Sequence, residues 1–134
     1  MSEYKKPLPL ITEQSKVFWD GCKKRKLLYQ KCNDCGEVIF LPKHLCPNCW
    51  SKNLSWAESS GNGRIHTFTV TYEAAPPEFM ADMPYCLAVI KLEEGFRMMS
   101  NIIDCDFEAL QCEQPVHVVF KDVTPEITLP VFAP

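Results

Sequence analysis

The sequence lacks any apolar run that approaches the roughly 20 residues of a membrane-spanning helix. Its first residues, Met1 to Lys6, are polar, so the chain also lacks the apolar core of a secretory signal. These absences predict an intracellular, cytoplasmic protein with no membrane attachment. Internal repeats and low-complexity tracts are missing as well. The 134 residues are enough for one ordinary domain or two very small ones.

Motifs that mark a catalytic nucleophile or a pair of catalytic carboxylates are also missing. Of the three histidines, His44 lies in a loop between cysteines, and His66 and His117 fall in segments with a strand pattern. A histidine on a strand is more often a partly exposed residue than a base. We therefore expect no catalytic residues and no independent enzyme activity.

Positive charge is scarce in the second half of the chain. Residues 1–60 hold ten Lys and Arg against six Asp and Glu, a net charge of +4. Residues 61–134 hold four Lys and Arg against eleven Asp and Glu, a net charge of −7. Binding to nucleic acid requires cations that offset phosphates. Binding to single-stranded nucleic acid is therefore kept as an alternative function and not as the preferred one.

Cysteine, by contrast, is abundant, with eight residues. Cys32 and Cys35 form one Cys-x-x-Cys pair, and Cys46 and Cys49 form a second pair after ten intervening residues. Two such pairs typically present four thiolates to one tetrahedral metal ion. Zinc is the expected ion, and iron in a rubredoxin-like site is the alternative. Four protein ligands leave no open position, so the metal is expected to be structural.

Disulfides, or a redox-active dithiol, are the competing interpretations of these four cysteines. The absent signal sequence and the metal-like spacing favour a reducing compartment instead. The other four cysteines are expected to be small buried apolar groups rather than catalytic ones. They are Cys22, Cys86, Cys105 and Cys112.

The first 60 residues predict a helix and a small metal-clamped ribbon. Thr12 can cap a helix from about Glu13 to Lys24, with Val17, Phe18 and Cys22 on one face. Strands are expected at 27–31 and 38–41, on either side of the first cysteine pair. Because a ribbon of this size has little hydrophobic core, the metal should supply much of its folding energy. The segment 59–63, S-S-G-N-G, reads as a hinge.

After the hinge the pattern has period two, which indicates strands. We expect five strands, with an irregular loop at 74–84, a tight turn at 93–95 and a helical turn within 104–111. The expected strands are 65–72, 85–92, 96–103, 116–123 and 127–132. Five strands favour a small closed barrel of the OB type. The predicted fold class is mainly β: an N-terminal helix and rubredoxin-like zinc ribbon at 1–60, then a five-stranded OB-fold barrel at 61–134.

The order of these motifs resembles that of the DUF35 family of zinc-ribbon OB-fold proteins. The resemblance covers nearly the whole chain. It runs through Pro7-x-Pro9, Phe18-Trp19, the two cysteine pairs, Phe40-x-Pro42, Ser60-Gly61-x-Gly63, Pro84-Tyr85 and Glu94-Gly95. Two positions depart from the pattern. Trp50 follows the fourth cysteine where glycine is usual, so a different turn is expected there, and 111–115 lacks a glycine turn.

This resemblance implies a helper subunit for acyl-CoA chemistry, one that binds an acyl-CoA or docks on a thiolase-like enzyme in a hetero-oligomer. A subunit that completes its partner's active site is a further alternative. Cations for CoA phosphates are available at the end of the expected helix, in Lys23, Lys24 and Arg25, and on adjacent-looking strands of the expected barrel, in Arg64 and Arg97. A solvated helix end is the simpler explanation for any single lysine. The apolar groups of the 74–84 loop either form a binding patch or cap the barrel.

Overall fold

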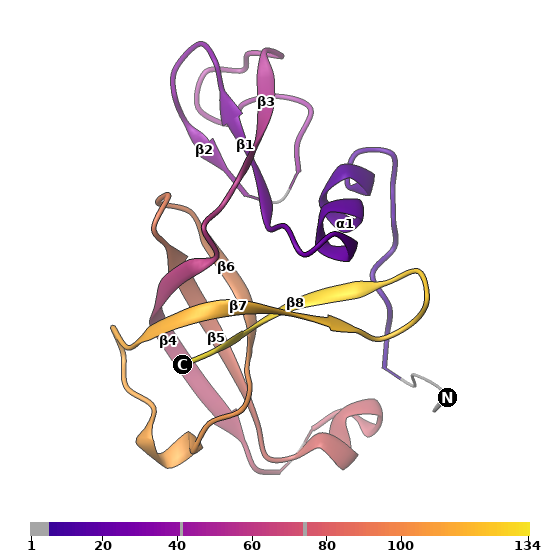
Figure 1. Ribbon diagram of the computed structural model, residues 1–134, viewed down its shortest axis with the longest axis vertical. Helices are drawn as coiled ribbons and strands as arrows, with labels where there is room; N and C mark the ends of the chain where they lie inside the picture. Colours follow the sequence, from indigo (N-terminus) through magenta and orange to yellow (C-terminus); the bar gives the residue numbers. More distant parts are fainter. Residues whose placement is uncertain (1–5, 41, 74) are drawn as a thin grey trace.

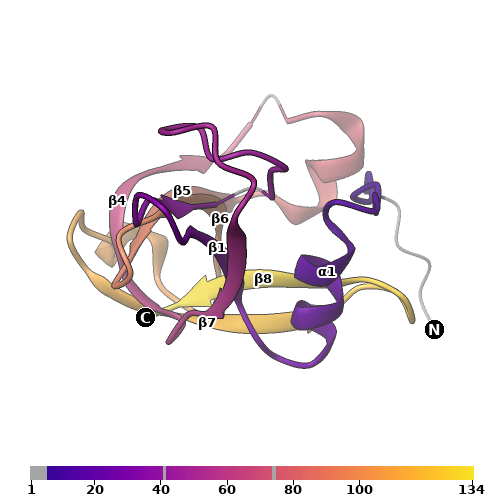
Figure 2. The same ribbon diagram turned by 90° about the horizontal axis from the view of Figure 1, so that it is seen from above.

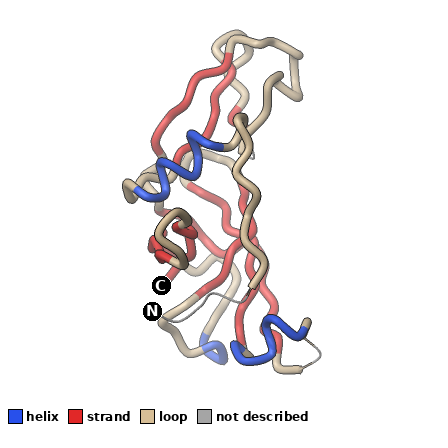
Figure 3. The backbone as a smooth tube through the Cα atoms, turned by 90° about the vertical axis from the view of Figure 1, so that its right-hand side faces the viewer, coloured by secondary structure: helices blue, strands red, loops and turns tan. Residues whose placement is uncertain are grey.

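The computed structural model describes residues 6–40, 42–73 and 75–134, and stacks a small three-stranded sheet on a closed barrel (Figure 1). The elements are α1 (Lys16–Lys23), β1 (Leu28–Cys32), β2 (Val38–Ile39), β3 (Leu54–Glu58), β4 (Asn62–Thr71), η1 (Pro77–Asp82), β5 (Tyr85–Leu92), β6 (Arg97–Ile102), η2 (Phe107–Ala109), β7 (Pro115–Asp122) and β8 (Thr128–Ala133). Seen from the side, the sheet and the barrel lie along the long axis of the molecule (Figure 3). Leu41 and Ala74, which belong to the expected strand 38–41 and loop 74–84, lie outside the described residues.

The barrel closes in the strand order β4-β5-β6-β8-β7, which confirms the predicted fold class. Neighbouring strands are antiparallel except β6 and β8, which run parallel and pair at Ile102 and Phe132. Along β5, side chains alternate between the barrel interior and the outer surface, as strand geometry requires. Ile65, Ile90 and Phe132 are fully buried and fill the interior.

The smaller sheet has the order β2-β1-β3. β1 lies in the centre and pairs antiparallel with both neighbours. The third strand, β3, was not expected from the sequence. Its five residues alternate only weakly in burial, so period-two hydrophobicity does not mark it. β3 brings the chain from the second cysteine pair directly to the barrel.

Helix α1 begins later than predicted, at Lys16 instead of Glu13. Before it, Thr12 and Ser15 bond to one another, each backbone N–H donating to the other's hydroxyl at 3.0 and 3.1 Å. This local exchange gives the backbone an alternative to the helix. Phe18 and Cys22 are buried as expected, but Val17 is exposed, so its assignment to the buried face was wrong.

An aromatic cluster joins the helix, the small sheet and the barrel. Phe40, just after β2, stacks on Phe96 of the β5–β6 turn with ring centroids 5.0 Å apart, and Phe18 of α1 packs edge-on against Phe40. Tyr29 of β1 lies 5.0 Å from Phe96. Helix α1 also contacts β7 and β8, as the view from above shows (Figure 2). The helix therefore packs on its own barrel.

The hinge between β3 and β4 is tied to the β5–β6 turn. Glu94 accepts hydrogen bonds from the Ser59 hydroxyl at 2.6 Å and from the Ser60 backbone N–H at 2.9 Å. Gly61 has a positive φ of 81°, and an added Cβ there would lie 2.5 Å from Val118 Cγ1. The Ser60-Gly61 motif of the hinge and the Glu94-Gly95 motif of the β5–β6 turn are therefore in direct contact.

No helix in the described ranges has the length and apolar character needed to cross a bilayer. The predicted boundary at residue 60 falls in the hinge, between the last strand of the small sheet and the first of the barrel. Because the aromatic cluster crosses this boundary, the division into two units stays a prediction.

Candidate metal centre

The four cysteines of the two Cys-x-x-Cys pairs converge at the far end of the small sheet. Their Sγ atoms all lie within 4.8 Å of one another. Cys32 and Cys49 are 3.5 Å apart, and Cys35 and Cys46 are 3.6 Å apart. A tetrahedral ion with bonds of about 2.3 Å to sulfur needs sulfurs about 3.8 Å apart. The donor set and its spacing therefore fit a metal ion of the zinc or iron type.

Two tight turns bring the sulfurs together. In the first, Gly36 donates its N–H to Cys32 O, and it has a positive φ of 79°. In the second, Trp50 donates its N–H to Cys46 O and has a φ of 66°. The second turn therefore keeps the left-handed conformation, although tryptophan replaces the usual glycine. The expectation of a different turn at Trp50 was wrong.

Two of the four thiols, those of Cys35 and Cys49, have shifted pKa values. Hydrogen bonds from the Asn48 side chain and from the Glu37 backbone lower the pKa of Cys35 to about 6. At Cys49 a backbone hydrogen bond from Ser51 lowers the pKa, but desolvation and the neighbouring sulfurs outweigh it and raise the pKa to about 12. The raised pKa of Cys49 means that its thiolate needs a compensating cation, which is what a bound metal supplies.

The site has the character of a structural rather than a catalytic centre. Cys32 and Cys46 are buried beside Ile39 in a small apolar cluster of their own. The backbone N–H of Cys35 donates to Cys32 Sγ at 3.5 Å. The backbone N–H of Asn48 donates to Cys46 Sγ at 3.4 Å. Such donors stabilise thiolates. His44 is exposed and is not a member of the cluster.

The other four cysteines fall into two groups. Cys22 and Cys86 are fully buried, and burial raises the pKa of their thiols to about 12 and about 11. They are inert apolar groups, as expected. Cys105 is half-buried, whereas Cys112 is exposed, so the prediction that it is a buried core residue was wrong.

The cations at the end of α1 are only partly available for a ligand. Arg25 makes a bidentate ion pair with Asp122 at 2.9 and 2.7 Å, and Asp122 also accepts from the Thr128 hydroxyl. Lys23 and Lys24 are exposed. Lys23 and Arg25 line a pocket of about 430 Å³ beside the β7–β8 turn.

Arg64 and Arg97 lie elsewhere. The expectation that they sit on adjacent strands was wrong, since β5 separates β4 from β6 and Lys91 stands between the two arginines. Arg64 pairs in register with Pro115 at the start of β7, whereas Asp122 ends the same strand. The eight residues of β7 lie between these two positions, so the cations around Arg25 and those around Arg64 are more than about 20 Å apart. The predicted cations therefore form two separate groups.

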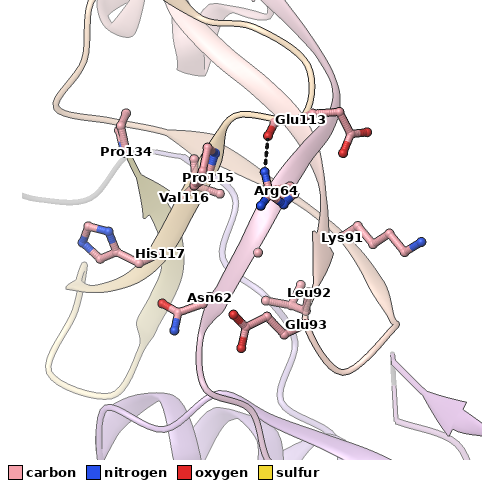
Figure 4. A pocket seen from close by; sticks show the side chains of 11 residues that line it. Asn62, Arg64, Lys91, Leu92, Glu93, Glu113, Pro115, Val116, His117 and Pro134 are labelled. Atoms are coloured by element: carbon pink, nitrogen blue, oxygen red, sulfur yellow. Dashed lines mark hydrogen bonds between the residues drawn. The ribbon is translucent and has the colours of Figure 1, made fainter.

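Arg64 also lines a shallow pocket of about 590 Å³ on the outer surface of β4, β5 and β7 (Figure 4). Its guanidinium donates to Glu113 O at 3.0 Å, and Lys91 of β5 lines the same pocket (Figure 4). His117, Glu93 and Glu113 also line it, so the charge there is mixed. Lys91 was missed from the sequence, although its place opposite both arginines follows from strand register.

Two family models match consecutive parts of the chain. Residues 19–55 match the rubredoxin-like zinc ribbon domain of ChsH2, and residues 56–121 match the C-terminal OB-fold domain of ChsH2. Together they cover the sheet that carries the sulfur cluster and most of the barrel.

Curated relatives carry two kinds of name. The chain is 35% identical over 118 residues to a "DUF35 domain-containing scaffold protein" of Methanothermobacter thermautotrophicus, covering 87% of this chain and 88% of that protein. It is 30% identical over 129 residues to a "Probable enoyl-CoA hydratase alpha subunit" of Thermomonospora curvata. There the match covers 96% of this chain but only 40% of the relative.

A solved structure agrees with these matches. A chain of the "Ltp2-ChsH2(DUF35) aldolase" superposes with a TM-score of 0.85 at 30% identity, covering 95% of this chain and 98% of that one. A DUF35 protein of Sulfolobus solfataricus, 14% identical with a TM-score of 0.63, shares the fold. From its paired cysteine turns to its closed barrel, this chain belongs to the DUF35 family.

Proposed function

We propose that this chain is a non-catalytic scaffold subunit that docks on an acyl-CoA enzyme of the thiolase or hydratase type. The observation that carries the proposal is the match over 98% of a chain in the "Ltp2-ChsH2(DUF35) aldolase" structure. The match to 40% of a hydratase alpha subunit adds support, because there a unit of this size is one part of a larger subunit.

Within this role the metal is structural. We propose that the ion is zinc, held by Cys32, Cys35, Cys46 and Cys49, with iron as the alternative. The family model that matches the small sheet is a zinc ribbon, which favours zinc. The ion would supply cross-linking of the two cysteine turns and no chemistry at a substrate. It would thereby keep the small sheet and its two cysteine turns folded.

Contact with the CoA part of a substrate is the finer proposal. Lys23, which lines the pocket at the β7–β8 turn, and Lys24 are both exposed, and we propose that they contact CoA phosphates. Arg25 would position this end of the helix through its ion pair with Asp122. Titration of the chain with a CoA thioester tests this. Saturable binding that is weakened by Lys23→Glu with Lys24→Glu supports it, and binding that those changes leave unaltered contradicts it.

Reconstitution tests the main proposal. The tagged chain is coexpressed separately with a thiolase-like and with a hydratase-like acyl-CoA enzyme of the source organism. We expect one enzyme to coelute in a stable complex and to turn over faster than it does alone, while the chain alone turns over nothing. Coelution with neither enzyme, or thioester turnover by the isolated chain, contradicts a scaffold role.

A further inference from the structure

The outer surface of β4, β5 and β6 carries a row of three cations. Strand register sets Arg64 opposite Lys91, and Lys91 opposite Arg97. Residues directly opposite on antiparallel strands project to the same face of a sheet. All three side chains are exposed. With strands about 4.8 Å apart, the row extends about 10 Å across the barrel.

This row is concentrated in a part of the chain that is otherwise acidic. Residues 61–134 hold four cations, and three of them stand in this row. In the described ranges, the ion pairs are made by Lys6, Lys16 and Arg25, so the row takes part in none of them. Of the acids nearby, Glu93 accepts a hydrogen bond from Ser60, and Glu113 contacts Arg64 through its backbone carbonyl.

Apolar side chains lie next to the cation row on the same face. Val89 stands two residues from Lys91 and pairs with Met99, which stands two residues from Arg97. Met99 is 65% exposed. Leu87, two residues before Val89 on β5, is 37% exposed. Thr67 and Thr69 of β4 complete the face opposite Val89 and Leu87. An exposed apolar centre beside a charged edge is the arrangement of protein interfaces.

The shape of the face also favours a protein partner. Small-molecule sites are concave and enclose most of their ligand. The pockets that border this face, one beside Arg64 and Lys91 and one beside Met99, are open to solvent and would not enclose a ligand in this way. In OB barrels the face of the second and third strands is the one that binds oligonucleotides and oligosaccharides, and the net charge of −7 in residues 61–134 disfavours a nucleic acid here. Here these strands are β5 and β6, which carry Lys91, Arg97 and the apolar residues.

We propose that the outer face of β4, β5 and β6 docks on an acidic surface of the acyl-CoA enzyme. The row Arg64, Lys91 and Arg97 meets carboxylates of the partner, and Leu87, Val89 and Met99 meet an apolar patch beside them. This inference rests on the proposed scaffold function and adds to it the surface that makes the contact. Charge complementarity fixes the sign of the partner surface and makes the association sensitive to salt.

Titration of purified full-length chains against the purified enzyme recovered in the reconstitution tests this inference. We expect Lys91→Glu with Arg97→Glu to weaken the complex about a hundredfold, because like charges across an interface repel strongly. The matched control is Lys31→Glu with Lys52→Glu, which changes the net charge equally at exposed ribbon positions. Met99→Gln should weaken the complex about tenfold, whereas the control Met80→Gln on η1, also exposed, should not.

The outcomes separate this inference from the proposed function. If the wild-type chain binds the enzyme and the double variant binds it equally well, the docking face is wrong and the scaffold role stands. If the wild-type chain binds neither enzyme, both proposals fail. Coenzyme A and a dT12 oligonucleotide serve as further probes. If the double variant no longer binds one of these probes but still binds the enzyme, the cation row contacts phosphates. That result overturns the inference.

Discussion

At the scale of single residues, close backbone approach decides which positions tolerate change. Gly63 of β4 faces its neighbour β5 so closely that an added Cβ would lie 2.6 Å from the Lys91 carbonyl oxygen. Backbone cannot move aside as a flexible side chain can. The second glycine of the Ser-Gly-x-Gly motif is therefore required by packing, and the first by its positive φ.

Gly63→Ala should accordingly destabilise the chain by about 1–3 kcal/mol, the usual cost of forcing extra atoms into a packed site. Urea unfolding at neutral pH measures the loss as a lower midpoint with an unchanged slope. Asn62→Ala, one residue earlier and exposed, is the control and should have little effect. Equal stability of the two variants would refute the close approach.

The ion pair between Arg25 and Asp122 predicts a pH dependence. Hydrogen bonds from Arg25, and then from Thr128, hold the pKa of Asp122 well below its usual range. A carboxyl with a lowered pKa in the folded state contributes stability above the unfolded value of about 3.9, and loses it as the pH falls below that value. Asp122→Asn should therefore lower the thermal midpoint at pH 7.

The same comparison at pH 3 should show a smaller difference between Asp122→Asn and the wild type. Glu126→Gln, an exposed change on the same hairpin, should leave the midpoint unchanged at both values. Thermal unfolding followed by circular dichroism measures all three chains. A difference that stays constant from pH 7 to pH 3 would show that the charge of Asp122 does not matter.

At the scale of elements, the ribbon depends on its cysteines more than on its strands. β2 has only two residues, and the buried cluster at the metal centre consists of Ile39 and the two ligands Cys32 and Cys46. So little buried surface cannot offset the entropy of ordering the loops. Metal binding must supply the difference, about 10–16 kcal/mol for structural zinc in small domains.

Cys46→Ser should therefore lose the metal and unfold the ribbon, and a strong chelator should have the same effect on the wild type. Mass spectrometry should find about one metal ion per wild-type chain, and hydrogen exchange should show loss of protection in residues 28–58. Cys112→Ser removes an exposed cysteine outside the cluster and should keep both metal and protection. A Cys46→Ser chain that retains its ion would disprove the ligand assignment.

At the scale of the whole molecule, the aromatic cluster couples the ribbon to the barrel. Phe96 is 5% exposed and contacts both Tyr29 and Phe40. Its ring belongs to the barrel, and its partners belong to the ribbon. We therefore expect metal-loaded protein to unfold in one transition, despite the change of charge and composition near residue 60.

Phe96→Ala should cost about 3–5 kcal/mol, as is usual for removal of a buried aromatic side chain, and should split unfolding into two transitions. Near-ultraviolet circular dichroism and calorimetry can be compared to detect the separation. Leu10→Ala, at an 82% exposed position, serves as the control. One unaltered transition in the Phe96→Ala chain would mean that the cluster does not transmit stability.

Much of this architecture could be predicted from the sequence, because the signals concerned are local. The spacing of Cys32, Cys35, Cys46 and Cys49 indicated one cluster. Pro84 before it and the turn at 93–95 after it located β5 at the residues it occupies, Tyr85–Leu92. Features that depend on contacts between distant segments were missed. β3 lacks alternation, the bonds between Thr12 and Ser15 delay the helix, and the position of Lys91 between two arginines requires the strand register.

Trp50 has an optical consequence. It is 77% exposed, it directly follows Cys49, and the other two tryptophans, Trp19 and Trp56, are half-buried against the core. Its emission should therefore be the most red-shifted of the three and the most accessible to iodide quenching. A chain that keeps Trp50 and carries phenylalanine at positions 19 and 56 would report ion loss at the cysteine turns as a change in fluorescence, without any added dye.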